Sequence, residues 1–153
     1  MKKTLIVMLM LCLLTACLAG CQKKADPAEK KEAAPAVIVL EDLSGAEAKA
    51  RALRESLEKD ALTQAEMNEK SAELYALWEA EMNRLLEAAQ KKLSAAELEA
   101  LSAEQAAWLE TRTQAAEAAG AEFAGGSMYT LVVNMEAAAL TEARVYALYE
   151  MLK

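Results

Sequence analysis

Histidine is absent from the 153 residues of this chain, and cysteine is confined to the first 21 of them. Without histidine, the chain lacks the side chain that most often serves as a general base or a metal ligand near neutral pH. Because Cys12, Cys17 and Cys21 all lie near the N-terminus, no disulfide is expected in the remainder. We therefore predict no catalytic residue, no metal site and no cofactor, and we do not expect an enzyme.

Proline and glycine are scarce as well, with two and five residues in the whole chain. This scarcity, together with a hydrophobic content of 55%, favours one small helical domain. Two capping boxes, Thr63-x-x-Glu66 and Ser94-x-x-Glu97, indicate where two helices begin, the first of them running to about Lys91. Further helices are expected over Ser44 to about Lys59 and over Ser127 to about Leu152. The short connections predict an all-α fold, an antiparallel helical bundle of about four helices.

The apolar residues repeat at helical spacing and so predict which faces are buried. In the second helix the stripe comprises Met67, Leu74, Trp78, Met82, Leu85 and Ala89. In the last helix the residues available for burial are Leu131, Met135, Leu140, Tyr146 and Tyr149. Both tryptophans lie on apolar stripes, which favours a role in the core over a carbohydrate-binding platform.

The first 20 residues have the pattern of a bacterial export signal, with two lysines before an apolar run that is short for a permanent membrane span. Leu18-Ala19-Gly20-Cys21 resembles the lipobox of bacterial lipoproteins, whose cysteine carries a diacylglycerol and fatty acyl chains such as palmitate. Leu14-Thr15-Ala16-Cys17 is the alternative, and an uncleaved membrane anchor is a third interpretation. We favour Cys21, because processing before Cys17 leaves an unmodified thiol in a hydrophilic segment.

Residues 21–36 are predicted to form the lipidated cysteine and a flexible tether, and residues 37–153 the folded domain. The tether contains Pro27 and Pro35 and no large apolar side chain to bury. The apolar run Val37 to Leu40 is too short for a sheet and is expected to pack as an extended arm against the helices. We expect an exported protein, anchored by lipid to the bacterial cell membrane or the outer membrane.

Three side chains that carry polar groups or rings are expected on one face of the third helix. Gln105, Trp108 and Arg112 follow the helical period, and Leu98 and Leu101 extend their face. Burying an unpaired amide or guanidinium is costly, so this face should meet groups that accept hydrogen bonds. We predict a structural role for it, with Arg112 bound either to helix-end carbonyls or to a glutamate.

Five further residues complete the set of sites. Asn83 is expected to hydrogen-bond across a helix interface, and Arg144 to have a structural role. Gly125 and Gly126 should end the third helix, because glycine is free to adopt a positive φ. Ser127 should then cap the last helix.

Several of these features occur in the order and spacing of one protein family. They are Thr63-Gln-Ala-Glu-Met-Asn68, Glu81-Met-Asn83, Gln105-x-x-Trp108-x-x-x-Arg112, Gly125-Gly126-Ser127 and Leu140-Thr-x-x-Arg144. From about Leu62 to Leu152 the chain resembles the lysozyme inhibitor LprI N-terminal domain family, which comprises small exported helical domains of bacterial envelope proteins. The family is named after a lipoprotein that inhibits lysozyme, and most members have no assigned activity.

The resemblance also implies a difference from the usual member of this family. Members usually carry cysteines in these helices, which pair as disulfides. The corresponding positions here are expected at Ser71, Ala116 and Met135. This chain would therefore lack the disulfide bracing that the resemblance implies.

The charge of the chain is concentrated in the domain. Residues 37–153 contain 11 lysines and arginines against 21 aspartates and glutamates, a net of −10, whereas residues 22–36 contain four lysines against three acids. Nucleic acid and anionic lipid are poor partners for such a surface. A cationic lysozyme-type protein is a suitable one, because opposite charge attracts it.

We therefore predict a lipid-anchored envelope protein whose acidic helical domain binds another protein, with inhibition of lysozyme as the leading hypothesis. One alternative is a structural or scaffold lipoprotein without inhibitory activity, whose acidity merely keeps it soluble. Another is a module that binds a small ligand between helices. The exposed turn from Gly120 to Ser127 is the predicted recognition patch, because loops held between rigid helices often carry recognition.

Lipidation at Cys21 is directly testable. We predict that Cys21→Ala yields an unacylated precursor, whereas Cys17→Ala leaves processing intact. Metabolic labelling with a fatty-acid analogue measures both variants. Label that is retained in Cys21→Ala and lost in Cys17→Ala would assign the lipid to Cys17 instead.

Overall fold

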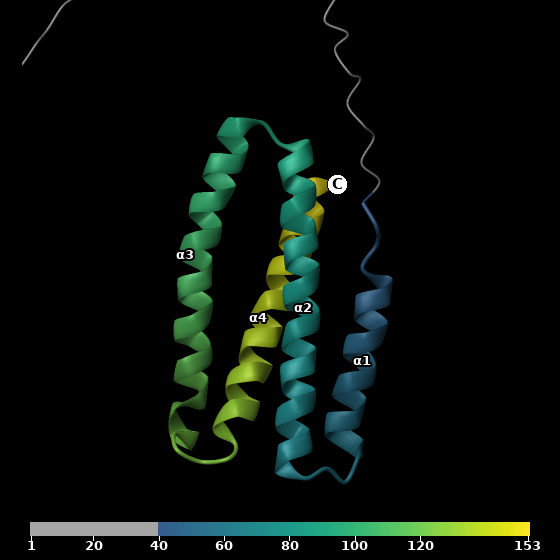
Figure 1. Ribbon diagram of the computed structural model, residues 1–153, viewed down its shortest axis with the longest axis vertical. Coiled ribbons are helices and arrows are strands. Elements are labelled where there is room, and N and C mark those ends of the chain that lie inside the picture. Colours follow the sequence, from purple (N-terminus) through teal and green to yellow (C-terminus); the bar gives the residue numbers. More distant parts are fainter. Residues whose placement is uncertain (1–39) are drawn as a thin grey trace, which may run out of the picture. The chain divides into compact units, whose positions relative to one another are not determined.

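The computed structural model describes residues 40–153, most of which lie in four α-helices (Figure 1). The elements are α1 (Ser44–Lys59), α2 (Gln64–Lys92), α3 (Ala95–Gly120), the short 3-10 helix η1 (Ala121–Phe123) and α4 (Tyr129–Leu152). Successive α-helices run in opposite directions, and the part of the chain that the structure describes contains no strand. The predicted all-α antiparallel bundle is confirmed.

Side-chain caps begin the two longest helices at the residues that the sequence predicts. The Thr63 hydroxyl accepts a hydrogen bond from the backbone N–H of Glu66 at 3.3 Å, and the Glu66 carboxylate accepts one from the backbone N–H of Thr63 at 2.7 Å. Ser94 and Glu97 repeat this arrangement at the start of α3. The hydroxyl of each cap residue donates to the carboxylate and lowers the pKa of Glu66 and of Glu97 below its ordinary value. These contacts satisfy N–H groups that have no partner inside a helix, and so they fix both helix starts.

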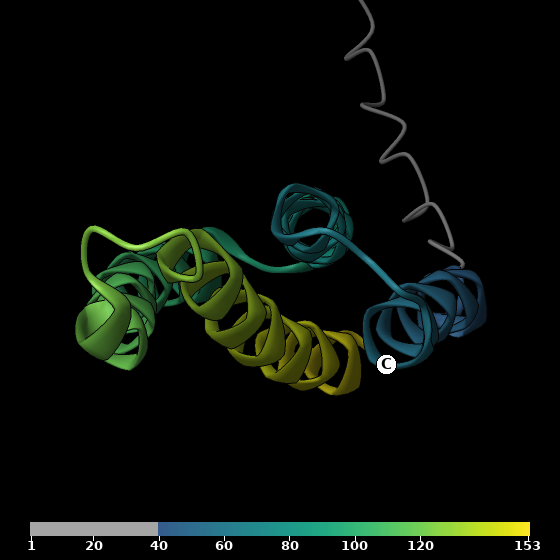
Figure 2. The ribbon, with the colours of Figure 1, turned by 90° about the horizontal axis from the view of Figure 1, so that it is seen from below.

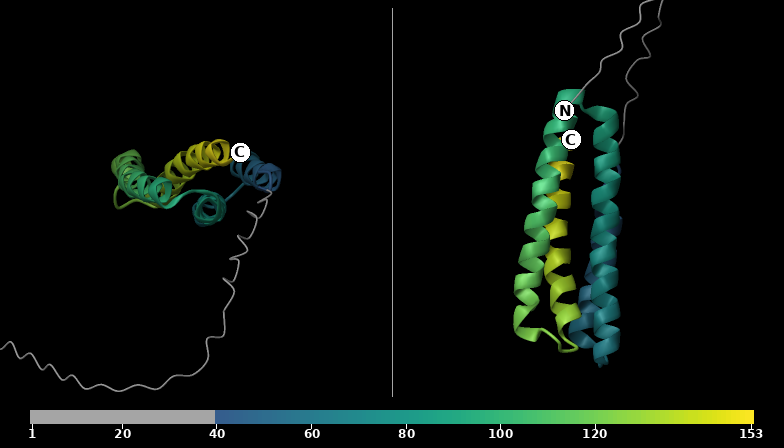
Figure 3. Two further views of the ribbon diagram at one scale, coloured as in Figure 1. Left: turned by 90° about the horizontal axis from the view of Figure 1, so that it is seen from above. Right: turned by 60° about the vertical axis from the view of Figure 1, so that its left-hand side comes forward.

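α4 lies at the centre of the bundle and contacts the three other helices. It packs against α2 and α3. It also meets α1, where Arg54 forms an ion pair with Glu142 and the Tyr146 hydroxyl donates a 2.7 Å hydrogen bond to Glu47. That hydrogen bond is the main reason why the pKa of Tyr146 is raised to about 12. Figures 2 and 3 show α4 between α3 on one side and the pair α1 and α2 on the other.

The face predicted for α2 is confirmed. Its buried apolar residues are Leu74, Trp78, Met82, Leu85 and Ala89. Met67, at the start of the same stripe, is partly buried. α2 packs against both α1 and α4, and its buried apolar residues still follow one helical stripe.

The residues predicted for burial in α4 do not form its most buried face, although Met135 and Tyr149 pack against the core. The buried residues of α4 are Ala137, Ala138, Thr141, Val145, Leu148 and Leu152. Of the five residues expected to be buried, Tyr146 is exposed and the other four are only partly buried. Because α4 contacts three helices, apolar residues occur on several of its faces, and helical spacing alone does not identify the deepest one. The most buried face begins with two alanines, whose small side chains allow neighbouring helices to approach closely.

The connection between α3 and α4 also differs from the prediction. α3 ends at Gly120, before the glycine pair, and η1 follows it. Gly125 does adopt a positive φ, of 78°, as expected. Ser127 does not cap α4, which begins at Tyr129 without a side-chain cap. The carbonyl of Gly126 accepts the N–H of Tyr129 at 3.3 Å, so a backbone turn leads into the helix and the serine hydroxyl is not required.

The export signal, both lipobox cysteines Cys17 and Cys21, and the tether lie outside the residues that the structure describes. Leu40, at the end of the predicted arm, is partly buried and packs against the core. Between residues 40 and 153, none of the helices combines the length and the apolar content that crossing a membrane requires.

Gly120 allows the end of α3 to approach α4 closely. A Cβ atom at this position would lie 2.5 Å from Cγ2 of Val133 and 3.0 Å from Cε2 of Tyr129. We predict that Gly120→Ala lowers the free energy of unfolding by about 1–3 kcal/mol, as overpacking a core does. Gly45→Ala is the matched control, because a Cβ atom there meets open space within α1.

The control variant should stabilise the protein by up to about 1 kcal/mol, since alanine favours a helix more than glycine does. Urea unfolding followed by circular dichroism measures both variants. Equal stability of the two would contradict the close approach of α3 and α4.

Candidate functional site

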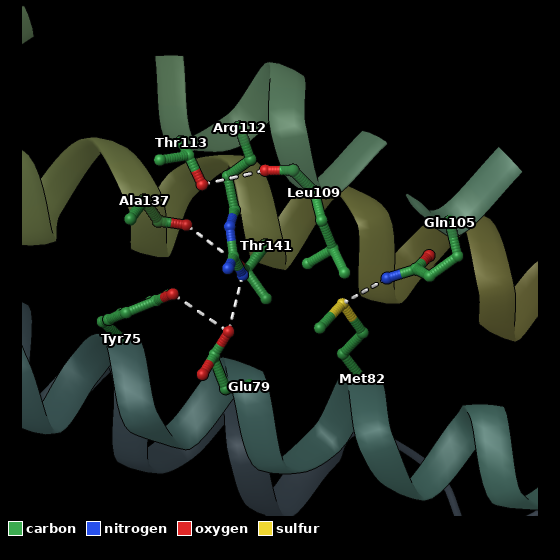
Figure 4. Close-up of polar contacts among 9 residues, drawn as sticks. All are labelled: Tyr75, Glu79, Met82, Gln105, Leu109, Arg112, Thr113, Ala137 and Thr141. Atoms are coloured by element: carbon green, nitrogen blue, oxygen red, sulfur yellow. Dashed lines mark hydrogen bonds and ion pairs between the residues drawn. The ribbon is translucent and has the colours of Figure 1, made fainter. Parts of the chain in front are cut away.

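The side chain of Arg112 extends from α3 into the space between α2 and α4 (Figure 4). Its Nη1 donates to Oε1 of Glu79 on α2 at 2.6 Å and to Oγ1 of Thr141 on α4 at 3.2 Å. Thr141 in turn donates to the carbonyl of Ala137 at 2.7 Å, and the Tyr75 hydroxyl donates to the same Glu79 oxygen at 2.9 Å. One guanidinium therefore connects three helices, and a glutamate is one of the two partners that the sequence suggested for it.

Two guanidinium groups lie close to the ring of Trp108. The Cζ atoms of Arg112 and Arg144 lie 5.2 Å and 5.7 Å from the centre of its ring. The Cζ atom of Arg112 also lies 5.2 Å from the centre of the Tyr75 ring. The face of an aromatic ring attracts a cation, and such a contact contributes about 0.5–2 kcal/mol depending on its hydration. Trp108 thus stabilises two positive charges in addition to filling space.

Gln105 and Arg144 form a second polar link between the helices. Nε of Arg144 donates to Oε1 of Gln105 at 2.9 Å, and its Nη1 donates to Glu104 at 2.6 Å. On the other side, Nε2 of Gln105 donates to the Met82 sulfur on α2 at 3.2 Å. Gln105, which is on α3, therefore links α2 to α4. Arg112 makes the same kind of link about two turns farther along α3.

These side chains form one group that we call the arginine cluster: Glu79, Gln105, Trp108, Arg112 and Arg144. The side chains of the two arginines are each 10% exposed, whereas those of Glu79 and Glu104 are 36% and 64% exposed. The cations are buried and their carboxylate partners reach solvent, so the buried charge is neutralised at the edge of the cluster. Burial, together with the hydrogen bond to Glu79, also raises the pKa of the Tyr75 hydroxyl.

Four predicted site residues do not belong to the arginine cluster. Asn83 is exposed and makes no side-chain hydrogen bond within residues 40–153, so the contact predicted for it across a helix interface is wrong. Gly125, Gly126 and Ser127 lie in the connection between α3 and α4, the predicted recognition patch, and all three are exposed. The Ser127 carbonyl accepts a 3.1 Å hydrogen bond from Asn68, which ties this connection to α2.

The sequence did not indicate three members of this polar network. Glu79 is one of 21 acidic residues in the domain, and nothing in its spacing distinguishes it from the others. Tyr75 is similarly inconspicuous, one turn before Glu79 on α2. Thr141 could have been found, because it lies within the feature Leu140-Thr-x-x-Arg144.

An open groove lies between α2 and α3, beside the arginine cluster, and has a volume of about 450 Å³. We call it the α2–α3 groove, and its lining residues are Leu86, Gln90, Leu98, Leu101, Ser102, Gln105, Ala106 and Leu109. Leu101 and Gln105 are buried at its base, and Leu109 is 36% exposed. The backbones of α2 and α3 do not pack closely, although the two helices are consecutive in the chain. The lining is mostly apolar, so the groove is suited to an apolar group.

The surface that α3 presents is acidic. α3 itself carries five acidic residues and one basic residue, Arg112. Over residues 93–152, which also include α4, the counts are nine and two, and both basic residues, Arg112 and Arg144, belong to the arginine cluster. The other lysines and arginines of the described chain lie on α1, on α2 and at Lys153. The negative charge of the domain is therefore not balanced by exposed cations on the α3 side.

The arginine cluster is organised for packing rather than for chemistry. Its amide and guanidinium groups hydrogen-bond mainly to one another, to Thr141 and to neighbouring acids. Across residues 40–153, no three carboxylate, thiol or imidazole side chains lie close enough together to hold a metal ion.

The arginine cluster should contribute strongly to stability. We predict that Arg112→Met lowers the free energy of unfolding by about 1–3 kcal/mol, because Glu79 and Thr141 lose their shared donor. Trp108→Ala should cost about 3 kcal/mol, near the lower end for a large aromatic residue because Trp108 is only partly buried. Gln114→Ala, at an exposed position of α3, is the control and should change stability by less than about 0.5 kcal/mol.

Thermal and urea unfolding measure all three variants. In the double variant of Arg112 and Trp108 the losses should not add, because the two side chains are in contact. Normal stability of both single variants, combined with loss of partner binding, would identify the cluster as a recognition site instead.

Comparison with known families places the whole arginine cluster inside one matched stretch. The family model described as Lysozyme inhibitor LprI matches residues 55–148, which is more than half of the chain. The match includes α2, α3, η1 and most of α4. Neither the curated proteins nor the solved structures that were searched contain a match. The chain belongs to the Lysozyme inhibitor LprI family, in agreement with the resemblance that its sequence features predicted.

Proposed function

We propose that this protein binds and inhibits a basic lysozyme-type enzyme through its acidic helical domain. The observation that carries the proposal is the family match over residues 55–148, because the family is described as one of lysozyme inhibitors. An inhibitor of this kind acts by binding and needs no catalytic residues of its own. The helices inside the matched stretch are also those that the arginine cluster joins.

The distribution of charge supports a basic partner. Residues 93–152 present nine acidic side chains, and both of their arginines are buried. Such a surface attracts a cationic protein during diffusion and raises the rate of association. Salt weakens this attraction, because the screening length falls from about 30 Å at 0.01 M to about 8 Å at 0.15 M ionic strength.

Inhibition requires the bound domain to cover the cleft of the enzyme. Glycosidases of the lysozyme type act on a polysaccharide with two carboxyl groups that flank the bond to be cleaved. A rigid helical domain lying over that cleft would exclude the polymer without entering any chemical step. The arginine cluster holds α2, α3 and α4 together in advance, so little further ordering of the chain is needed on binding.

We further propose that the protein is exported and held at a membrane by a lipid on Cys21, with Cys17 as the alternative. The support is the sequence pattern of residues 1–21. Acyl chains contribute about 0.8 kcal/mol per buried methylene, and more than one chain gives stable anchoring. The tether would allow the domain to reach a partner near the membrane surface.

Inhibition by the domain alone tests the proposal. We predict that residues 37–153, produced without the signal and the tether, fold without oxidation and give a helical circular dichroism spectrum. They should slow the lysis of a cell-wall suspension by a basic lysozyme at about 0.01 M salt, and more weakly at about 0.15 M.

The control for this assay is an unrelated domain of similar size and net charge. It should inhibit only at low salt, because non-specific attraction is screened whereas shape complementarity is not. Equal inhibition by the control, or none by the helical domain, would contradict the proposal. The scaffold interpretation would then be favoured. Inhibition that does not change as the salt concentration is raised would instead favour a ligand-binding module.

A further inference from the structure

The α2–α3 groove exposes apolar surface that no other part of the described chain covers. Leu86, Leu98 and Leu109 line it and are all at least partly exposed. Its base is firm, because Gln105 is held there by Met82 on one side and by Arg144 on the other. An apolar side chain of a partner would lose water on entering this groove and would meet a surface that is already ordered.

The edge of the groove on α3 is a row of carboxylates. At 100° per residue, Glu99 and Glu110 lie on the same stripe of α3 as Ala106, which lines the groove, and Glu117 continues this stripe about two turns beyond Leu109. All three glutamates are exposed, and none of them forms an ion pair within residues 40–153. Within residues 40–153, these three carboxylates are therefore free to pair with the cations of a partner.

The opposite edge, on α2, is largely uncharged. By the same helical geometry, Asn83 and Gln90 lie beside Leu86 on the outer side of α2, and Glu87 lies farther out. Both amides are exposed and can donate or accept hydrogen bonds. Two cations are next to these amides in the sequence: Lys91 follows Gln90, and Arg84 follows Asn83 and forms a 2.7 Å ion pair with Glu81.

We propose that the α2–α3 groove is the surface that receives the basic partner. An apolar side chain of the partner enters the groove, and lysines or arginines beside it pair with the row of glutamates on α3. This inference rests on the proposed function and names the surface that performs it. The pairing explains why an apolar groove lies next to acidic residues that have no counter-charge of their own.

Two other surfaces fit a basic partner less well. The connection between α3 and α4 carries a single acid, Glu122. The hollow between α1 and α4, of about 380 Å³, is lined by charges of both signs that include Arg51 and Arg54. A cationic protein would meet like charge there, whereas it meets only acids along α3.

Two arginine substitutions on consecutive residues of α3 test the groove directly. Ala106 and Ala107 are both exposed, but only Ala106 lines the groove, and Ala107 faces away from it. Ala106→Arg and Ala107→Arg therefore change the net charge equally and differ only in position. The full chain in phosphatidylcholine vesicles, whose surface is zwitterionic, is mixed with a basic lysozyme, and binding is measured by co-flotation.

At about 0.15 M salt we expect Ala106→Arg to weaken binding by at least about tenfold, and Ala107→Arg by less than about threefold. Leu109→Ser should also weaken binding, whereas Met151→Ser, at an exposed methionine on α4, should not. Unchanged thermal unfolding of the four variants shows that they fold normally.

The possible failures are distinguishable. Absence of binding by the unsubstituted protein contradicts the proposed function. Normal binding by the unsubstituted protein and an equal effect of the substitutions at Ala106 and Ala107 would overturn the groove and leave the function in place. A dimer of the unsubstituted protein that Ala106→Arg dissociates would show that a second copy occupies the groove, and would also overturn the inference.

Discussion

The buried guanidinium of Arg112 links α2, α3 and α4. A cation in the interior is tolerated only when hydrogen bonds, an opposite charge and aromatic faces compensate for lost water. Glu79, Thr141 and the rings of Tyr75 and Trp108 supply these contacts from all three helices. The backbones of α2 and α3 do not pack closely, and the α2–α3 groove lies between them, beside the arginine cluster.

The arginine cluster also shapes the surface of the domain. Arg112 and Arg144 are the only basic residues between positions 93 and 152, and both are directed inward. Arg112 forms an ion pair with Glu79 on α2, and Arg144 forms one with Glu104 on α3. The other acidic residues of α3 form no ion pair within residues 40–153. Because both arginines are buried in contacts between helices, the exterior of this part of the domain is acidic. The proposed attraction of a basic partner follows from this arrangement.

The sequence predicts features that depend on local chemistry. The caps at Thr63 and Ser94 and the apolar stripe of α2 were read correctly because each depends on residues within a few turns of one helix. The buried face of α4 was not, because it depends on three neighbouring helices. Ser127 failed as a cap because a backbone turn replaces it.

The same distinction holds for the candidate site: features within one helix could be predicted from the sequence, whereas contacts between helices could not. The common face of Gln105, Trp108 and Arg112 follows from spacing on one helix. The choice of Glu79 among many glutamates, and the groove beside it, depend on how distant helices meet. Asn83 illustrates the limit, since its position on α2 is clear from the sequence whereas its exposure is not. The family could be recognised because its motifs are identified by their residues, order and spacing, which do not depend on these contacts.

Hydrogen–deuterium exchange of the protein with and without a basic lysozyme tests the central claim most directly, because it maps contact along the whole domain. We predict slower exchange in the last turns of α2 and the first half of α3, around residues 83–110, with α1 unchanged. Protection confined to residues 120–127 or to α1, or no protection of the domain at all, would contradict it.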